Sequence, residues 1–277
     1  MVNFDKSTLI VSHPDDECLF ASSLLNKIST LIICFGNIPY ENKISIGRKK
    51  AIKHYPLKNI KVINLDLSQS IKSFYPINWY RVIDKKSGIK RGYKEESYDK
   101  NYDELLDKLR NLIPKDGYLF THNPWGEYGH GEHCQVFKAC FAISKETSSQ
   151  LYVTGYVSQL SKHYAKIKTH LISPKILKFE TNKRVYNLLK KHYTKYDCWT
   201  WDPVYKIPKI EFFYKVNLSY DSKSIITKNN CLNIPLIKIN HHNPLIYIIR
   251  KIIKIFVPSL LQNFFNKCKL FIWKLKK

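Results

Sequence analysis

Two short segments rich in histidine and carboxylate side chains carry the chemistry that this sequence can support. The first, SHPDDE, spans residues 12–17, and the second, THNPWGEYGHGEH, spans residues 121–133. Imidazole nitrogens and carboxylate oxygens are the usual protein ligands of a catalytic divalent metal ion. A carboxylate that stays off the metal can accept a proton from water. The two segments together therefore favour metal-assisted hydrolysis.

The first segment places His13 and Asp16 three positions apart, across a turn that Pro14 stiffens. At this spacing an imidazole nitrogen and a carboxylate oxygen can meet on one cation and leave Asp15 beside them as an unligated carboxylate. A plainer interpretation is that Asp15 and Asp16 cap the helix that follows, because acidic residues are common at helix N-termini.

The second segment contains three histidines within 12 residues, and two glycines flank His130. His130 and His133 stand three apart at the start of a predicted helix, so they share a face and can serve as a metal ligand and a neighbouring acid. An HxxH pair alone is a weak signal. Combined with the first segment, it completes a set of two histidines and one carboxylate, which is how proteins hold a catalytic zinc ion with an open position.

Alternating β-rich and helical segments around these motifs predict an α/β fold. We expect a Rossmann-like three-layer sandwich with a mostly parallel sheet, followed by C-terminal amphipathic helices. The predicted strands are 7–12, 30–35, 61–65, 117–121 and 151–157, the predicted helices are 18–27, 44–54, 102–113, 133–144 and 183–196, and 85–101 is a predicted surface loop. Both histidine-rich segments follow strands, and the ends of parallel strands meet beside a ligand crevice.

The charge of the chain is strongly basic and uneven. Its 277 residues include 46 Lys and Arg against 22 Asp and Glu, for a formal net charge of +24, which indicates an anionic partner. Asp221 is the last acidic residue, and the positions after it carry 11 Lys or Arg. We therefore divide the chain into a catalytic domain, 1–220, and a basic tail, 221–277.

Other features of the sequence predict a cytoplasmic protein. No signal peptide is readable at the start of the sequence, and no run of 18 apolar residues indicates a transmembrane helix. The seven cysteines include no CxxC pair and are expected to be reduced packing residues.

The HPDDE motif after the first strand and the GHxxH-type motif after a later strand resemble those of the PIG-L/LmbE-type zinc-dependent N-acetylglucosaminyl de-N-acetylases. The resemblance covers about residues 7–145. It implies a hydrolase that uses Zn²⁺ to remove acetyl groups from glycolipids and glycosides that contain N-acetylglucosamine. By this likeness, His13, Asp16 and His133 match the metal ligands.

The resemblance also implies roles for the residues beside the metal. Asp15 matches the general base, and His130 matches a protonated group that stabilises the oxyanion or protonates the leaving amine. Tyr128 matches a tyrosine that contacts the same oxyanion. Glu132 stands where many relatives carry Asp, at a position that is not a ligand. Arg48 is the candidate match for a family arginine after the second strand, without the accompanying carboxylate, and we assign it to substrate binding.

Aromatic side chains near the second motif are candidates for the walls of a sugar pocket. Trp125 and Tyr128 lie inside the motif, whereas Trp199 and Trp201 lie farther along the chain. Aromatic faces pack on the apolar side of sugar rings, although the alternate spacing of Trp199 and Trp201 equally suits ordinary packing on a strand. We assign Trp125 and Asn123 to substrate binding.

The tail contains two segments with an amphipathic helical pattern. In 245–257 the four polar positions share one narrow face and the other nine residues are apolar, and a second apolar stripe follows Pro258. A basic helix with a broad apolar face suits the headgroup region of an anionic membrane. We therefore expect peripheral association with the cytosolic membrane face through residues 245–277. Packing of these helices on the catalytic domain or on a second subunit is the alternative.

Three functional hypotheses follow from these features. The leading one is a peripheral-membrane, zinc-dependent de-N-acetylase that acts on a lipid- or nucleotide-linked amino sugar in glycolipid or surface-polysaccharide biosynthesis. The second is an amidase of the same family that acts on a non-lipid glycoside or thiol conjugate. The third is a basic membrane- or nucleic-acid-binding protein without catalysis. Nucleic acid is not expected, because the charge lies beside long apolar stripes. The same ligand set also binds other divalent metals.

Overall fold

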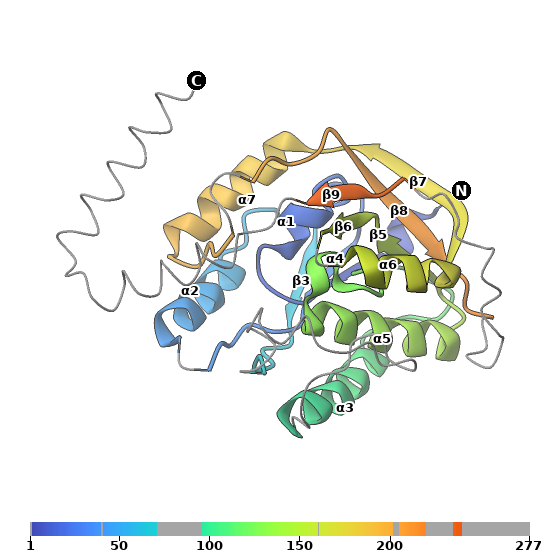
Figure 1. Cartoon of the computed structure of the whole chain (residues 1–277). Helices are drawn as coiled ribbons and strands as arrows, with labels where there is room; N and C mark the ends of the chain where they lie inside the picture. Colours follow the sequence, from blue (N-terminus) through green and yellow to red (C-terminus); the bar gives the residue numbers. More distant parts are fainter. Residues whose placement is uncertain are drawn as a thin grey trace. The chain divides into compact units, whose positions relative to one another are not determined.

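Within the residues that the structure describes, seven strands form one mixed sheet, in the computed structural model shown in Figure 1. Their order across the sheet is β3-β2-β1-β4-β5-β8-β7. The first five of these are parallel to one another, and β8 pairs antiparallel with both β5 and β7. A separate parallel pair joins β6 and β9. The bounds are β1 Ser7–Val11, β2 Thr30–Ile33, β3 Lys61–Asn64, β4 Tyr118–Thr121, β5 Gln150–Thr154, β6 Tyr156–Ser158, β7 Ile172–Glu180, β8 Ile210–Val216 and β9 Ile237–Ile239.

The structure describes residues 2–39, 41–70, 96–159, 161–201, 205–219 and 235–239. The compact unit that contains them runs from Met1 to Asn240, and His241–Lys277 is a second unit. The tail helices predicted in 245–277 lie outside the described residues. None of the helices described here has both the length and the apolar character needed to cross a membrane.

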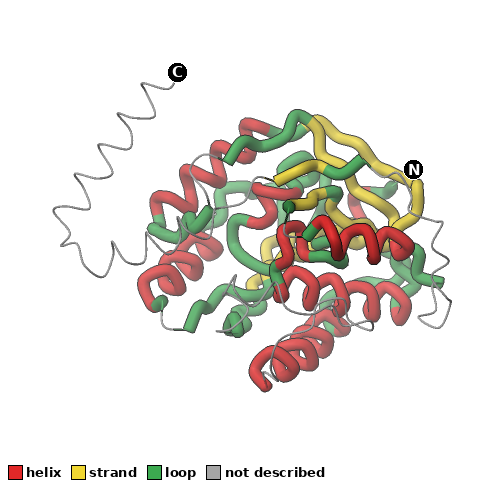
Figure 2. The backbone as a smooth tube through the Cα atoms, viewed as in Figure 1, coloured by secondary structure: helices red, strands yellow, loops and turns green. Residues whose placement is uncertain are grey.

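Helices cover both faces of the sheet and produce three layers (Figures 1 and 2). One face is covered by α1, α2 and α7, and the other by α3, α5 and α6. The single turn α4 precedes α5. This arrangement confirms the predicted α/β sandwich with a mostly parallel sheet. The bounds are α1 Asp16–Phe20, α2 Asn42–Lys53, α3 Glu96–Arg110, α4 Gly126–Gly129, α5 Gly131–Glu146, α6 Lys162–Lys168 and α7 Lys183–Lys195, with 3-10 helices at Phe4–Lys6 and Thr169–Leu171.

The core is divided between the two faces of the sheet because successive strand residues point to opposite sides. On β1, Leu9 and Val11 join the cluster under α1 and α7, whereas Ile10 joins the cluster under α3 and α5. All five residues of β1 are buried, as is typical of a strand covered on both faces. The residues that follow β1 therefore start from a rigid support.

Helix α3 begins earlier than the sequence predicted. It starts at Glu96, so residues 96–101 are helical where we expected a surface loop. The Tyr98 hydroxyl and the Asn101 amide donate to backbone carbonyls of distant segments at 2.6 and 2.7 Å. These tertiary contacts hold a polar segment in a helix whose hydrophobic pattern starts only later.

Two other predicted elements are shorter than expected. Helix α1 ends at Phe20 instead of continuing to residue 27, because Ser22 and Ser23 donate through their backbone N–H and hydroxyl groups to the buried Glu211 carboxylate. The predicted strand 151–157 is interrupted at Gly155, whose N–H donates to a β8 carbonyl, so it forms β5 and β6.

The antiparallel strands β7 and β8 extend the sheet beyond the strands that we predicted. β7 exposes most of its side chains, so its hydrophobic alternation is weak in the sequence. Pairing with β8 nevertheless supplies its backbone hydrogen bonds. Through the pairing of β8 with β5, these strands form the side of the sheet opposite β3.

Gly47→Ala is expected to lower the free energy of unfolding by about 1–3 kcal/mol, the usual cost of overpacking. A Cβ atom at this position of α2 would lie 2.1 Å from the carbonyl oxygen of Tyr196, just after α7. Chemical denaturation of Gly47→Ala beside Lys53→Ala, an exposed position on the same helix, tests this. Equal stability of the two variants would show that α2 does not rest on α7 at this point.

Candidate metal centre

The two histidine-rich segments begin where the neighbouring parallel strands β1 and β4 end. From β1 the sheet continues through β2 to β3, and from β4 it continues the other way to β5. The carboxyl edge between β1 and β4 is therefore a topological switch point, where the loops diverge and leave room for a ligand. Here Ser12 and His122, 110 positions apart, are hydrogen-bonded.

The three predicted metal ligands converge at this edge. His13 Nδ1 lies 3.1 Å from Asp16 Oδ2, and His133 Nε2 lies 3.3 Å from the same oxygen. Ligand atoms that are each about 2.0–2.2 Å from a tetrahedral zinc ion are about 3.3 Å apart from one another. His13 and His133 are thus each at a spacing from Asp16 that suits coordination of a common ion, and ligand atoms of His13, His130 and His133 also lie within 4.8 Å of one another.

The outer nitrogen of each of these imidazoles is bound to a buried carboxylate. His13 Nε2 lies 2.7 Å from Glu132 Oε2, and His133 Nδ1 lies 2.7 Å from Glu127 Oε2. A ring that donates its N–H to the outer carboxylate offers the lone pair of its other nitrogen, which faces Asp16, to a metal ion. His133 Nε2 is buried and has no hydrogen-bond partner among the described residues. A divalent metal ion would satisfy this atom, so the donor set fits a metal.

His122 lies near the same oxygen but its two nitrogens are already engaged. Its Nε2 is 3.4 Å from Asp16 Oδ2 and accepts a hydrogen bond from the Ser12 backbone N–H at 2.9 Å. Its Nδ1 lies 3.0 Å from a Glu127 oxygen. The donor atoms of Asp16, His122 and His133 lie within 4.8 Å of one another. Because its lone pair is used by Ser12, we exclude His122 from the ligand set.

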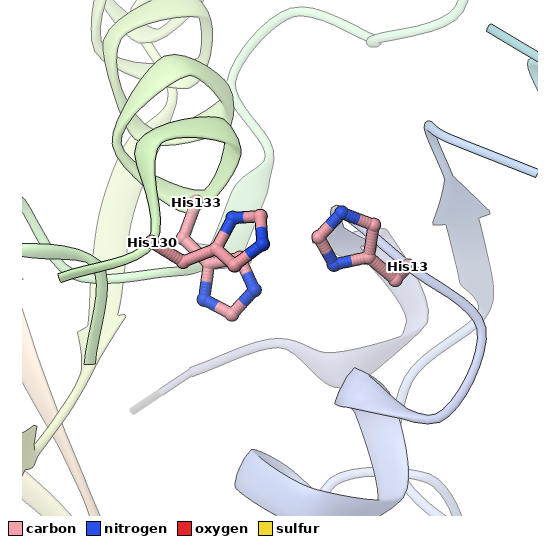
Figure 3. A group of neighbouring side chains, drawn as sticks. All are labelled: His13, His130 and His133. Atoms are coloured by element: carbon pink, nitrogen blue, oxygen red, sulfur yellow. The ribbon is translucent and has the colours of Figure 1, made fainter. Parts of the chain in front are cut away.

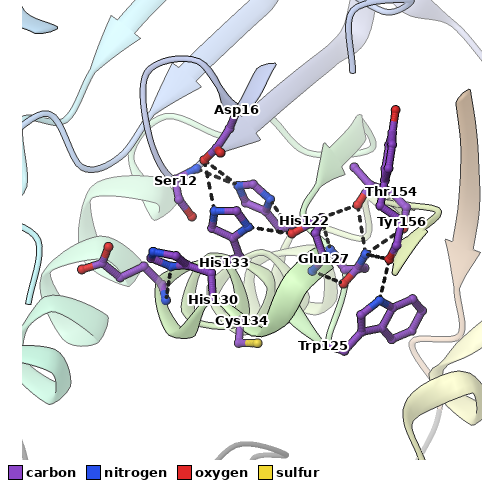
Figure 4. A network of polar contacts seen from close by, with 12 residues as sticks. Ser12, Asp16, His122, Trp125, Glu127, His130, His133, Cys134, Thr154 and Tyr156 are labelled. Atoms are coloured by element: carbon purple, nitrogen blue, oxygen red, sulfur yellow. Dashed lines mark hydrogen bonds and ion pairs between the residues drawn. The ribbon is translucent and has the colours of Figure 1, made fainter. Parts of the chain in front are cut away.

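The Glu127 carboxylate organises the second segment (Figure 4). It accepts hydrogen bonds from the imidazoles of His122 and His133, from the Asn123 backbone N–H and from the Thr154 hydroxyl. Burial alone would raise the pKa of this carboxyl, but the two imidazoles outweigh burial and lower the pKa of Glu127 to about 2. Glu127 is therefore ionised and fixes the orientation of the ligand His133.

The backbone around Glu127 contains several residues with positive φ angles. Glu127 has a φ of 50°, in the left-handed region that non-glycine residues rarely adopt. The glycines that flank the turn, Gly126 and Gly129, have φ values of 66° and 92°. A residue with a side chain would be strained at either glycine position, so this turn depends on the two glycines.

Glu132 holds the other ligand imidazole. Besides its contact with His13, it accepts hydrogen bonds from Gln69 Nε2 and the Ser70 backbone N–H, both at 2.7 Å. The Gln69 side-chain oxygen in turn accepts a hydrogen bond from Arg48 Nη1 at 3.0 Å. Arg48 is only 2% exposed. Its hydrogen bond to Gln69 connects it, by way of Glu132, to the ligand imidazole.

The predicted base, Asp15, is buried beside the ligands in a left-handed conformation with a φ of 101°. Its Oδ2 accepts a hydrogen bond from the Thr200 hydroxyl at 3.3 Å, and its backbone N–H donates to Glu17 Oε2 at 3.0 Å. The hydroxyls of Tyr55 and Tyr193 donate to the other oxygen of Glu17. Burial raises the pKa of Glu17 to about 7. This network keeps Asp15 in a strained conformation.

The pKa values of Asp15 and His130 shift in opposite directions. Burial, followed by the negative charge of Asp16, raises the pKa of Asp15 well above its usual range. Burial and the nearby imidazoles of His133 and His13 lower the pKa of His130 well below its usual range. This environment favours the neutral ring of His130, and the protonated ring that the family resemblance implied stays a prediction.

The His130 ring faces the rings of His13 and His133, with centroid distances of 4.8 and 4.6 Å (Figure 3). Its Nδ1 accepts a hydrogen bond from the Glu132 backbone N–H at 3.3 Å. A neutral ring with Nδ1 as acceptor carries its proton on Nε2, which makes Nε2 a donor. The Tyr128 ring packs 5.6 Å from the His130 ring. Both predicted catalytic side chains of this segment thus lie beside the ligands.

Trp125 and Asn123 are structural residues, contrary to our assignment to substrate binding. Trp125 is fully buried, and its indole N–H donates to the Tyr156 carbonyl at 2.7 Å. Asn123 is also fully buried; its amide donates to the same carbonyl at 2.9 Å, and its Oδ1 accepts from the Glu127 N–H. Burial leaves neither side chain a surface for a sugar. Both instead hold the loop that carries Glu127.

Several residues of the site were not identified in the sequence analysis. Glu127 sits between glycines in a histidine-rich segment, and this position could have drawn attention to it. Glu132 was recognised as a non-ligand, but its contact with His13 was not foreseen. Gln69 and Thr200 reach the site from distant loops, and no local pattern marks them. Only the fold brings these side chains behind the ligands and the base.

These features define an α/β protein with a buried histidine and carboxylate centre at a switch point of its sheet. A deacetylase of teicoplanin biosynthesis, solved in complex with bog, matches with a TM-score of 0.50 and 14% identity, over 76% of this chain and 98% of that chain. The antimicrobial reagent A40926 pseudoaglycone deacetylase Dbv21 matches with a TM-score of 0.49 and 11% identity, over 79% and 99% of the two chains. The first of these likenesses shows a shared fold.

Among proteins compared by sequence, the uncharacterized protein L374 of Acanthamoeba polyphaga mimivirus is 28% identical over 167 residues. The match covers 56% of this chain and 64% of that protein, so the chain spans less than two thirds of the length of this relative. No family model matches the chain.

His133→Ala is expected to abolish binding of a divalent metal, because it removes the ligand nitrogen that lacks any other partner. His130→Ala is expected to retain the metal, because the three assigned ligands remain. Metal content after incubation with Zn²⁺ and gel filtration, measured by mass spectrometry, tests both. Equal metal retention in the two variants would contradict the division into ligand and non-ligand histidines.

Glu127→Gln is expected to weaken metal binding about 10- to 100-fold, the usual effect of losing a carboxylate behind a ligand histidine. The change keeps the shape of the side chain but removes the charge that orients His133. Competition with a chromogenic chelator measures the affinity. Glu146→Gln, on the exposed end of α5, is the control, and an equal affinity for both variants would argue against this role of Glu127.

Proposed function

We propose that the protein is a metal-dependent amide hydrolase that removes an N-acetyl group from an amino sugar. The observation that carries this proposal is that His13 Nδ1 and His133 Nε2 lie 3.1 and 3.3 Å from the same oxygen, Asp16 Oδ2. Asp15 and His130 lie beside them, and ligand atoms of His13, His130 and His133 are within 4.8 Å of one another. The fold shared with a teicoplanin-pathway deacetylase agrees with this chemistry. The donor set of two imidazoles and one carboxylate suits Zn²⁺, which we propose as the cofactor.

A divalent metal ion held by the three ligands supplies Lewis acidity, which polarises a carbonyl oxygen and favours the ionisation of water near pH 7. Asp15 is the only carboxylate of the HPDDE motif that is neither an assigned ligand nor bound to tyrosines. In the proposed reaction it accepts one proton from the attacking water and then delivers it to the departing amine nitrogen. The amide C–N bond breaks, and acetate and a free amino sugar are the products.

His130 acts as a hydrogen-bond donor in this proposal. Its Nδ1 accepts the Glu132 N–H, and in the proposed reaction its Nε2–H donates to the oxygen that gains negative charge. A preorganised donor of this kind is typically worth about 2.7–4 kcal/mol of transition-state stabilisation. Tyr128, packed against His130, is proposed to contact the same oxygen.

The sugar is proposed to pack on aromatic side chains at the end of the later segment. Trp201 is half-buried, and its ring lies 5.1 Å from the ring of Tyr128. The neighbouring Thr200 donates to Asp15. Trp201 therefore takes the place that we first gave to Trp125 as an apolar wall for a sugar ring.

The basic, apolar tail at 245–277 supports a finer version of the proposal. In that version the amino sugar is lipid- or nucleotide-linked, and the protein works at the cytosolic membrane face in glycolipid or surface-polysaccharide biosynthesis. A non-lipid glycoside or thiol conjugate is the competing substrate class. Comparing acetate release from substrates with and without the lipid separates these classes.

Asp15→Asn is expected to lower the rate of acetate release from N-acetylglucosamine-containing substrates about 10²- to 10⁴-fold while metal content is unchanged. Asn tolerates the left-handed backbone of this position, so the loop should keep its shape. Asp116→Asn is a matched control, because Asp116 is also left-handed, with a φ of 56°, but is exposed. Full activity of Asp15→Asn, or no acetate release by a metal-loaded wild type from any amino sugar, would refute the proposal.

A further inference from the structure

The two long helices on one face of the sheet, α2 and α7, carry an unusual distribution of charge. Together they contain ten Lys or Arg and no Asp or Glu. The helices on the opposite face, α3, α5 and α6, contain eight Lys or Arg and seven Asp or Glu. The excess positive charge of this unit's helices therefore lies on one side of the sheet, although the whole chain is basic.

The two helices lie side by side (Figure 1). His192 Nε2 of α7 lies 2.8 Å from the Ala51 carbonyl of α2, and the rings of His54 and Tyr196 stack with centroids 6.0 Å apart. These contacts join the C-terminal ends of the two helices, so α2 and α7 are neighbours. We call their solvent side the basic face; its exposed cations are Lys43, Lys49, Lys50, Lys53, Lys183, Arg184, Lys191 and Lys195.

Most cations of the basic face have no acidic partner within the described part of the chain. Lys43 pairs with Asp197 and Lys49 pairs with Asp66. The other six exposed cations make no ion pair with any residue that the structure describes. Clustered like charges repel one another in the free protein, and an anionic surface would relieve that repulsion.

Apolar side chains stand among these cations. Ile46 on α2 and Leu188 on α7 are 54% and 42% exposed, and they are two of the four large hydrophobic residues that are most exposed in the described residues. Tyr196 and Trp199 are half-buried at the end of α7. Lysines with aliphatic and aromatic neighbours are typical of a surface that meets lipid headgroups, whereas a nucleic acid would leave Ile46 and Leu188 without an apolar partner.

We propose that the basic face of α2 and α7 docks on the surface of an anionic lipid bilayer. The attraction comes from the unpaired lysines, and Ile46 and Leu188 enter the headgroup region. This assigns a membrane contact to the catalytic unit itself, in addition to the contact proposed for the tail. The docking step involves no catalysis and stands apart from the proposed reaction.

The location of the basic face gives the docking a consequence for catalysis, which rests on the proposed function. The Lys43–Asp197 pair joins the start of α2 to the residues after α7. Three residues later, Thr200 donates to the proposed base, Asp15. A bilayer against the basic face would thus lie next to the segment that borders the site, where a lipid-linked sugar could enter.

The test compares two full-length variants that lose the same charge. One carries Lys50→Glu, Lys53→Glu, Lys191→Glu and Lys195→Glu on the basic face. The control carries Lys100→Glu, Lys115→Glu, Lys145→Glu and Lys175→Glu, which are exposed positions elsewhere. Cosedimentation is measured with vesicles of phosphatidylglycerol and phosphatidylcholine and with vesicles of phosphatidylcholine alone. Circular dichroism and thermal unfolding verify that both variants fold.

Wild type should partition onto the phosphatidylglycerol vesicles and be released by high salt. The basic-face variant should bind at least about tenfold more weakly, because each lysine near an anionic surface adds severalfold to binding. The control should bind within about threefold of wild type. Equal losses in both variants would show that only total charge matters and would overturn the proposal. Binding of wild type to RNA but not to the vesicles would also overturn it.

Failure of this test is distinct from failure of the proposed reaction, because vesicle binding is measured without substrate. Ile46→Ser with Leu188→Ser provides a second measurement at unchanged charge. This variant should lower vesicle binding at high salt more than at low salt, since only the apolar contact is lost. Unchanged binding at every salt concentration would contradict a contact between this face and lipid.

Discussion

One buried carboxylate oxygen, Asp16 Oδ2, is the point on which the whole site depends. It accepts the His13 backbone N–H at 2.8 Å and lies within 3.1–3.3 Å of the imidazoles of His13 and His133. Burial alone would raise the pKa of Asp16, but the neighbouring histidines hold it well below its usual range. An uncompensated carboxylate charge at this depth would destabilise the fold. The loops after β1 and β4 both supply groups that compensate this charge, so the two loops must lie together.

Two further buried carboxylates lie behind the imidazoles that surround Asp16. Glu127 and Glu132 hold the outer nitrogens of the two ligand imidazoles. Glu132 is in turn bound by Gln69, after β3, and Glu127 by Thr154, at the end of β5. Loops from four strands therefore converge on one small volume. The strained backbones of Asp15 and Glu127 fit this arrangement, because several contacts outside each residue determine its conformation.

The sequence predicts those parts of the fold and the site that depend on residues close together in the chain. The apolar runs before His13 and His122 mark β1 and β4, and the parallel topology then brings the two histidine-rich segments to one edge. The ligand spacing of His13 and Asp16 is equally local. By contrast, the contact of Glu132 with His13 spans 119 positions and that of Thr200 with Asp15 spans 185. No periodicity encodes such pairs.

The sequence was misleading for side chains that can either bind a substrate or support a loop. Trp125 and Asn123 stand among the ligands, so proximity in the chain suggested a place in the pocket. A loop that carries several buried polar groups also needs side chains that satisfy its own backbone, and these two residues do so. The early start of α3 has a related cause, because tertiary hydrogen bonds stabilise a turn that has no apolar stripe.

The edge strand β7 affects whether a strand of another chain can pair with this sheet. A free strand edge offers a row of backbone groups to which another strand can add. β7 interrupts that row with Pro174, with a register irregularity between Ile172 and Ile176, and with exposed Lys175 and Lys178. These features disfavour edge-to-edge pairing of two sheets through β7.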